Sequence, residues 1–376
     1  MLTFDPWIHA RPGLQAAARR GDWPGVRAVL AGADLAELSW SVARLAELSG
    51  VEKWLRRLVE ADPSDALAGT TLAARETVLA WQARGSGTGD TVSRRQAREF
   101  HGLLVRAEDR LQVVLAREPG YVPAWEISLR TALGLELGQP EASRRYDQVA
   151  RRVPDHFPAQ LEYLQHLLPK WGGSWGAAEE FAAECAAAAP DGSPGRAVLA
   201  AVVIERFVAE RRPDPIVATL PAVRRAAEGS VLHPSHAPGA WDPVVHSQLV
   251  FLFSVAGEHA HAAPHFRALG DRPASAGWLH LHDADRWYLY ERALALGGRA
   301  GRPPGRMPWE PPRRGVAWVA SVVVCAVLAV AGLAGMLWGV RTAVLGDVGS
   351  GAGIAIVAFG PFGIGVGMLR RAFGTG

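Results

Sequence analysis

The sequence contains little lysine, little cysteine and, before its C-terminal region, few β-branched residues. Arginine supplies nearly all of the basic charge, because the only lysines are Lys53 and Lys170. The two cysteines, Cys185 and Cys325, cannot build a disulfide framework, and each is predicted to be a small buried apolar side chain. Ala, Leu and Arg are frequent, which favours helices over sheets. We therefore expect an all-α protein.

The sequence also lacks a concentration of positive charge that would suit nucleic acid. Its formal net charge is +3 and its pI is about 9.1. Three of the 40 basic residues and one of the 37 acidic residues lie from Gly315 onwards, so 37 basic and 36 acidic residues precede it. Without a basic stripe, nucleic acid is not an expected partner. The arginine pairs are predicted to lie on solvated helix faces: Arg19-Arg20, Arg56-Arg57 and Arg144-Arg145.

Recognisable catalytic machinery is missing as well. The glycine-rich run Gly85–Asp90 lacks the Lys-Ser/Thr pair and the preceding strand of a phosphate-binding loop, and it is predicted to be a flexible loop. Gly85-Ser86-Gly87 and Gly349-Ser350-Gly351 are short turns with no strand before them, so neither serine is a predicted nucleophile. We predict no catalytic residue and no cofactor.

Two long apolar segments lie in the C-terminal region. Val316–Val340 runs for 25 residues without a charge, which is enough for a helix to cross a hydrocarbon core about 30 Å thick. Trp318 and Trp338 mark its two ends, where indoles prefer the membrane interface. The second segment, 349–369, is also uncharged, although Pro361 and several glycines interrupt it. We therefore predict a hairpin of two transmembrane helices, with the lipid bilayer as a partner.

The distribution of arginine predicts the orientation of this hairpin. Arginines precede the first apolar segment and Arg370 and Arg371 follow the second, whereas the connection between them carries only Arg341 and Asp347, so both termini should face the cytoplasm. Residues 1–25 contain no apolar core of a signal peptide.

We predict a multi-pass protein of the plasma (cytoplasmic) membrane. Its predicted regions are a cytosolic helical-repeat domain (1–297), a Pro/Arg-rich linker (298–314), transmembrane helix 1 (315–340), a short external loop (341–348), transmembrane helix 2 (349–369) and a cytosolic tail (370–376).

Paired prolines recur along the first 300 residues. The pairs are spaced 35 and then 36 residues apart, at Pro119/Pro123, Pro154/Pro158 and Pro190/Pro194. In each pair the first proline would end one helix and the second would lie in the first turn of the next, where its missing N–H costs nothing. A small residue and a second apolar residue precede each pair at fixed offsets: Ala107 and Leu111, Ala142 and Tyr146, Ala178 and Ala182. A looser boundary of the same kind is predicted at 61–68, and Ala262, Phe266 and Pro273 keep a similar order.

This pattern resembles that of tetratricopeptide-type repeats, which have a period of about 34 residues and end each helix pair with a proline. The resemblance implies an α-solenoid of about four to six helical hairpins, whose concave surface binds other proteins or peptides. The Trp and Gly expected in the first helix of such a repeat are mostly absent. A 3.6-residue apolar periodicity independently predicts a helix whose core-facing residues are Phe100, Leu103, Leu104, Ala107, Leu111, Val114 and Leu115.

The most individual motif is Lys170-Trp171-Gly172-Gly173-Ser174-Trp175. It resembles a feature of an uncharacterised group of actinobacterial proteins with repeat-like helices, a resemblance that names a family and implies no activity. As a structural element, the two glycines would adopt positive φ in a turn, Ser174 would cap the next helix and the tryptophans would pack over the turn. As a binding element, Lys170 would hold a partner's carboxylate while Trp171 and Trp175 provide apolar contact.

Eight of the twelve histidines lie between positions 233 and 282. His280, His282, Asp283 and Asp285 bring two imidazoles and two carboxylates together, which makes them candidate zinc or iron ligands. The His-Glu-x-x-His spacing of a metalloprotease is missing, and solvated or capping histidines are the expected alternative.

The predicted function is a non-enzymatic, membrane-tethered scaffold or adaptor that binds an unidentified protein or peptide on its cytosolic solenoid surface. Two alternatives remain: a metal-dependent enzyme that uses the late His/Asp cluster, and an accessory subunit of a larger membrane complex.

Overall fold

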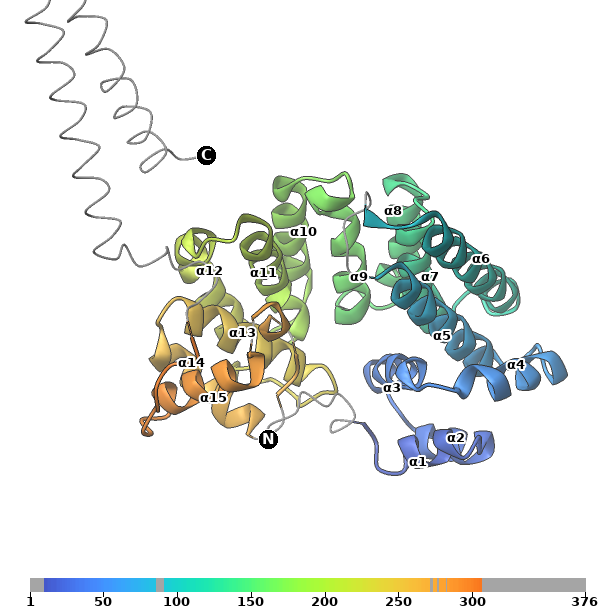
Figure 1. The fold of residues 1–376 in the computed structure, drawn as a ribbon, viewed down its shortest axis with the longest axis horizontal. Helices are drawn as coiled ribbons and strands as arrows, with labels where there is room; N and C mark the ends of the chain where they lie inside the picture. Colours follow the sequence, from blue (N-terminus) through green and yellow to red (C-terminus); the bar gives the residue numbers. More distant parts are fainter. Residues whose placement is uncertain (1–9, 86–90, 271–272, 276, 282, 306–376) are drawn as a thin grey trace, which may run out of the picture. The chain divides into compact units, whose positions relative to one another are not determined.

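The computed structural model describes residues 10–85, 91–270, 273–275, 277–281 and 283–305. Over these residues the protein is all-α, with fifteen α-helices and no strand, as the composition predicts (Figure 1). The chain divides into two units, Met1–Trp309 and Glu310–Gly376. The second unit lies outside the described residues, and with it the two predicted transmembrane helices, the loop between them, the tail and Cys325. No helix of the described part is both long and apolar enough to span a bilayer.

The first half of the unit Met1–Trp309 contains eight helices: α1 (Leu14–Arg19), α2 (Trp23–Leu30), α3 (Leu35–Glu47), α4 (Val51–Ala61), α5 (Ala66–Arg84), α6 (Arg94–Arg117), α7 (Val122–Gly134) and α8 (Gln139–Ala150). The second half contains α9 (Phe157–Leu167), α10 (Trp175–Ala188), α11 (Val198–Glu210), α12 (Asp214–Gly229), α13 (Asp242–Val255), α14 (His259–Leu269) and α15 (Ala284–Ala295). Three short 3₁₀ helices lie between them: η3 (Pro169–Trp171), η4 (Pro194–Ala197) and η5 (Trp278–His280).

Local sequence explains where many of these helices begin. Asp34 accepts a hydrogen bond from the Glu37 amide while the Glu37 side chain accepts one from the Asp34 amide, which is a complete capping box at the start of α3. Pro123 and Pro158 lie in the first turns of α7 and α9, so the predicted role of these prolines is confirmed. The third pair behaves differently, because Pro194 begins η4 and helix α11 starts only at Val198.

Helices that alternate along the chain form one continuous row. The odd-numbered helices α3, α5, α7, α9, α11 and α13 each pack on the next member of this odd row, and from α5 to α14 each even-numbered helix packs on the odd-numbered helix before it. In Figure 1 the helices of this unit accordingly follow one another in sequence order. Five of the six residues at the predicted small and apolar positions are buried: Ala107, Leu111, Ala142, Ala178 and Ala182. The sixth, Tyr146, is partly buried and packs against the same core.

Helix α5 is enclosed by four neighbouring helices. It packs on α3, α4, α6 and α7, and even its Thr70, Arg75 and Glu76 are buried. Small side chains make this close packing possible: a Cβ atom at Gly69 would lie 2.8 Å from a methyl group of Val114 on α6. Five of the seven predicted core residues of α6 are buried against it or its neighbours: Leu104, Ala107, Leu111, Val114 and Leu115.

One tryptophan connects the start of α13 with α3, at the two ends of the odd row. Trp241, just before α13, donates a hydrogen bond from Nε1 to the carbonyl of Ala36 on α3, at 3.1 Å and across 205 residues of sequence. Its ring meets the edge of Trp40 with centroids 5.1 Å apart, and it lies near Phe157 at the start of α9. This Trp241–α3 contact joins the second half of the unit to the first.

Candidate functional site

The Lys170–Trp175 motif forms the connection between α9 and α10. Helix α9 ends at Leu167, η3 follows, and Gly172 then adopts φ 86°, a left-handed conformation that favours glycine. Ser174 caps α10, because its hydroxyl accepts a hydrogen bond from the Ala177 amide at 3.1 Å. The predicted turn and cap are therefore confirmed.

Gly173 is required for a different reason from the one expected. Its φ is not positive; instead its backbone approaches α9 so closely that a Cβ atom would lie 2.0 Å from the carbonyl oxygen of Leu167. That carbonyl accepts a hydrogen bond from the Ser174 amide at 2.9 Å. The second glycine of the motif thus lets the chain turn back against the end of α9.

Ser174 also stands in a Gly-x-Ser-x-Gly sequence, Gly172–Gly176. In hydrolases this pattern places the serine on a sharp turn between a strand and a helix. Here a 3₁₀ turn precedes it, and the hydroxyl bonds to a backbone amide. Within the described residues no histidine hydrogen-bonds to Ser174, so the geometry is that of a helix cap.

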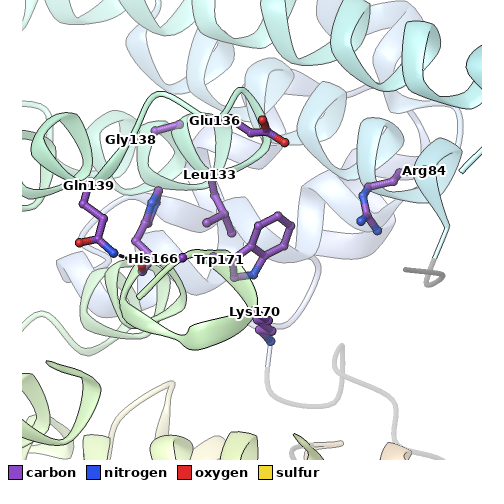
Figure 2. Close-up of a pocket in the computed structure, with 10 residues that line it drawn as sticks. Arg84, Leu133, Glu136, Gly138, Gln139, His166, Lys170 and Trp171 are labelled. Carbon is purple, nitrogen blue, oxygen red and sulfur yellow. Dashed lines mark hydrogen bonds between the residues drawn. The ribbon is translucent and has the colours of Figure 1, made fainter. Parts of the chain in front are cut away.

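Trp171 forms part of the wall of a groove of about 780 Å³. Figure 2 shows its indole between Leu133 and the guanidinium of Arg84. The groove lies where the C-terminal end of α5, the α7–α8 connection and the α9–α10 connection meet. Its lining residues are Arg84, Ala132, Leu133, Glu136, Gly138, Gln139, His166, Lys170, Trp171 and Gly172. We call it the Trp171 groove.

Aromatic and basic groups from distant parts of the sequence meet at this groove. The rings of Trp81 and Trp171 contact edge to face with centroids 5.8 Å apart, and the Arg84 guanidinium lies 5.7 and 6.0 Å from their respective centroids. The ammonium of Lys170 is 2.8 Å from the Glu205 carboxylate on α11. The predicted role of Lys170 as a holder of a partner's carboxylate would therefore require competition with this ion pair.

Trp175 does not share the groove with Trp171. It packs against the apolar core of the second half of the unit, and the Arg206 guanidinium lies 5.9 Å from its ring. The structure thus brings Lys170, Trp171 and Gly172 to one groove, while Ser174 caps a helix and Trp175 lies elsewhere.

The wall of the groove beside His166 is held by buried hydrogen bonds. His166 donates from Nε2 to the carbonyl of Leu129 at 2.9 Å, and burial lowers the pKa of its imidazole, so the neutral form is favoured. Gln139, at the start of α8, donates to the backbone carbonyl of His166 at 3.2 Å. These contacts fix α7, α8 and α9 relative to one another, which gives the groove a preformed wall.

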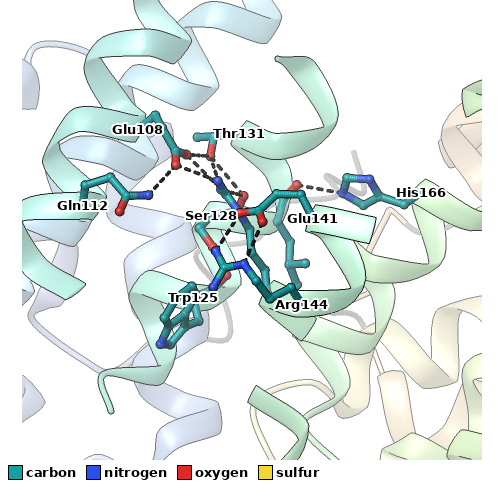
Figure 3. A network of polar contacts seen from close by, with 10 residues as sticks. Glu108, Gln112, Trp125, Ser128, Thr131, Glu141, Arg144 and His166 are labelled. Atoms are coloured by element: carbon teal, nitrogen blue, oxygen red, sulfur yellow. Dashed lines mark hydrogen bonds and ion pairs between the residues drawn. The ribbon is translucent and has the colours of Figure 1, made fainter. Parts of the chain in front are cut away.

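A second polar network lies between α6, α7 and α8, and it overturns one expectation. Arg145 was expected on a solvated face, but only 2% of it is exposed. Its guanidinium bonds to both carboxylate oxygens of Glu108, at 2.7 and 2.9 Å, to Glu141 at 2.7 Å and to the carbonyl of Ser128 (Figure 3). Arg144, its neighbour in sequence, is exposed and pairs with Glu141 near Trp125. The sequence Arg-Arg therefore contains one buried structural cation and one surface cation.

The late His/Asp cluster lies around η5 and the start of α15. His280 is in η5, and His282 lies outside the described residues. Asp283 directly precedes α15, has a φ of 58° and lies 3.8 Å from Arg286. Asp285 is in the first turn of α15. The part of the chain that the structure describes contains no group of three His, Cys, Asp or Glu side chains able to hold a metal ion.

Two other histidines differ from the expected solvated or capping role. His246 on α13 and His265 on α14 are buried and contact each other.

Cys185 is the small buried residue that was expected, and burial raises the pKa of its thiol to about 12.

No family model, no curated protein and no solved structure matches this chain. The all-helical architecture is therefore established without a family, and the resemblances noted in the sequence remain resemblances.

The sequence did not point to most of the groove. Arg84, Gln139 and His166 come from three helices, and nothing in their local sequence marks them as neighbours of Trp171. One local signal was present in the sequence: Gly138-Gln139-Pro140 marks the start of a helix, because proline is favoured in a first turn.

Proposed function

We propose that this protein is a membrane-tethered scaffold of tetratricopeptide-like helical hairpins that binds a protein or peptide partner in the Trp171 groove. The repeat assignment is supported by the alternating helices of the odd row and by the proline-bounded starts of α7 and α9. In such arrays each unit contacts mainly its neighbours, which leaves extended surfaces for partners. The tether is supported by the uncharged run of 25 residues from Val316 to Val340.

The observation that carries the binding proposal is the meeting of Trp171 with Arg84 in a preformed hollow of about 780 Å³. This volume lies within the roughly 300–1,000 Å³ typical of ligand sites. Tryptophan and arginine are the residue types that most often dominate binding energy at interfaces. A half-buried indole with a guanidinium beside it suits a peptide segment in which an apolar side chain adjoins a carboxylate.

The chain offers a matched pair of substitutions that tests this proposal. Trp171→Ala removes the groove wall, whereas Trp175→Ala removes an indole four residues away that does not line the groove. We expect a partner captured from solubilised membranes by the wild-type chain to be retained by Trp175→Ala and lost with Trp171→Ala. Equal retention by both variants, with both folded by circular dichroism, would exclude the groove as the binding site.

A further inference from the structure

A second, smaller cavity lies on the odd row itself. Its volume is about 280 Å³, and its lining shares no residue with that of the Trp171 groove. Four successive helices of the odd row contribute to it, and the indole of Trp241 closes one side. The lining residues are Ala43, Arg44, Ala46, Glu47, Ala74, Thr77, Val78, Glu126, Ile127, Arg130, Pro158, Leu161, Glu162 and Trp241. We call it the Glu162 cavity.

The carboxyl group of Glu162 lacks a close partner in this cavity. Arg130 lies 3.8 Å from it, which is too far for a hydrogen bond, and no other side chain or amide in the described part of the chain donates one to it. About 27% of the Glu162 side chain is exposed, although its helix α9 is surrounded by α7, α8, α10 and α11. Burial, followed by the charge of Glu126, raises the pKa of this carboxyl, and only Arg130 opposes the rise. A group that supplied hydrogen bonds and positive charge would therefore stabilise the ionised carboxylate.

Three of the other four charged side chains of the cavity already have closer partners, and the fourth, Arg130, is paired with Glu162 itself at 3.8 Å. Arg44 is 2.9 Å from Glu47, and its guanidinium stacks 4.6 Å from the centroid of the Trp40 ring. Glu126 accepts a hydrogen bond from the buried His156 at 2.9 Å. Glu162 is thus the acceptor that remains for a ligand, and the three carboxylates outnumber the two guanidinium groups of the lining.

The walls and the size of the cavity limit what can bind beside Glu162. Val78, Ile127 and Leu161 provide aliphatic surface, and Trp241 provides an aromatic ring that attracts cations. The volume is slightly below the roughly 300–1,000 Å³ of sites for drug-sized ligands, so one side-chain-sized group fits.

We propose that the Glu162 cavity binds one organic cation, an alkylammonium or alkylguanidinium group, with Glu162 as its hydrogen-bond acceptor and counter-ion. The alkyl part contacts the aliphatic wall and the cationic end lies between the Glu162 carboxylate and the Trp241 ring. The same chemistry is offered by a free amine and by the lysine or arginine side chain of a partner protein.

The test uses the purified full-length chain and four probes of similar size: n-butylammonium, n-butylguanidinium, n-butanol and butyrate. Titration calorimetry and saturation-transfer NMR should detect binding of the two cations at least tenfold tighter than that of the alcohol or the acid. Glu162→Gln, which keeps the shape and removes the charge, should weaken cation binding at least tenfold. Glu180→Gln, at an exposed position of α10, is the matched control and should bind the cations like the wild-type chain.

The outcomes separate cleanly. Equal binding of butanol and butylammonium would mean that the cavity is merely apolar, and tighter binding of butyrate would assign it to Arg44 and Arg130. Either result overturns the proposal. The absence of cation binding at millimolar concentration overturns it as well. The wild-type probe series decides this even if Glu162→Gln does not fold. Capped lysine and arginine amides, titrated alongside, distinguish the sources: binding as tight as that of the free cations favours a partner's side chain, and binding of the free cations alone favours a small amine.

Discussion

The imidazoles of His246 and His265 contact each other in the interior of the second half of the unit, with their Nδ1 atoms 2.8 Å apart. A hydrogen bond between two such nitrogens needs one protonated and one unprotonated Nδ1 atom, so the accepting ring cannot be protonated at Nδ1 without losing this bond. Burial lowers the pKa of His246 to about 4, and burial together with the neighbouring His246 lowers the pKa of His265 to about 3. Both rings are therefore neutral in the folded protein near neutral pH.

This pair predicts a loss of stability in mild acid. In the unfolded chain each imidazole titrates near pH 6.5, well above its pKa in the folded protein, so the unfolded state binds more protons as the pH falls below about 6.5. The stabilising contribution is complete above that pH and is lost progressively as the pH falls towards 4. Between pH 7 and pH 5 the free energy of unfolding should fall by up to about 2 kcal/mol for each imidazole.

Urea unfolding of the full-length chain at both pH values measures this effect. In His246→Phe/His265→Phe, which leaves apolar rings beside Phe253, the pH-dependent loss should be clearly smaller. His101→Gln, at an exposed position of α6, should keep the wild-type pH dependence. An unchanged loss in the double variant would show that other groups cause it.

The arginine pair of α8 predicts two very different substitutions at adjacent positions. Arg145→Ala leaves Glu108, which is mostly buried, without its bidentate partner and should cost about 3–5 kcal/mol of unfolding free energy. Arg144→Ala removes an exposed ion pair with Glu141 and should cost less than about 1 kcal/mol. Denaturant unfolding of the two variants compares them directly, and similar costs would contradict the assignment of Arg145 as a buried structural cation.

The glycines of the α9–α10 connection predict a graded series. Gly173→Ala forces a Cβ atom against the carbonyl of Leu167 and should destabilise the protein by about 2 kcal/mol or more. Gly172→Ala has open space but a positive φ, and it should cost about 1 kcal/mol. Gly176→Ala lies within α10 with only an ordinary contact at 3.9 Å and should be neutral or slightly stabilising. Thermal unfolding should rank the three variants in this order. A loss for Gly173→Ala no larger than that for Gly172→Ala would contradict the close approach at Gly173.

The proposed tether predicts a clear difference in cell fractionation. The full-length chain should remain with membranes after carbonate extraction, whereas a chain ending at residue 305 should be released, because it lacks both apolar segments. Leu328→Arg places a charge near the centre of the first apolar segment and should weaken retention of the full-length chain. Release of the wild-type chain by carbonate would contradict the tether.

The sequence predicted those features of the fold that local chemistry controls. Pro123 and Pro158 fix φ at the position where a helix begins, and Ser174 supplies a hydroxyl to the first free amides of α10, so these boundaries follow from neighbours in the sequence. Periodicity likewise identified the buried face of α6, because a helix brings every third or fourth residue to one side.

Features that depend on distant partners could not be predicted in this way. Arg145 has the same local surroundings as Arg144, and only the position of Glu108, 37 residues earlier, makes one buried and the other exposed. Trp171 and Trp175 look equivalent in the motif, but the helix that begins between them directs them to different neighbours, Trp81 and Arg206. The groove and the cavity are likewise assembled from several helices whose packing no single segment encodes.

The Trp241–α3 contact has a mechanical consequence. An open array of helical hairpins can stretch or tighten gradually, because each joint between neighbours flexes a little. Here one indole hydrogen bond and one ring contact tie α3 to the chain entering α13, across nearly the whole row. A load that separates α3 from α13 would therefore have to break this hydrogen bond and this ring contact first.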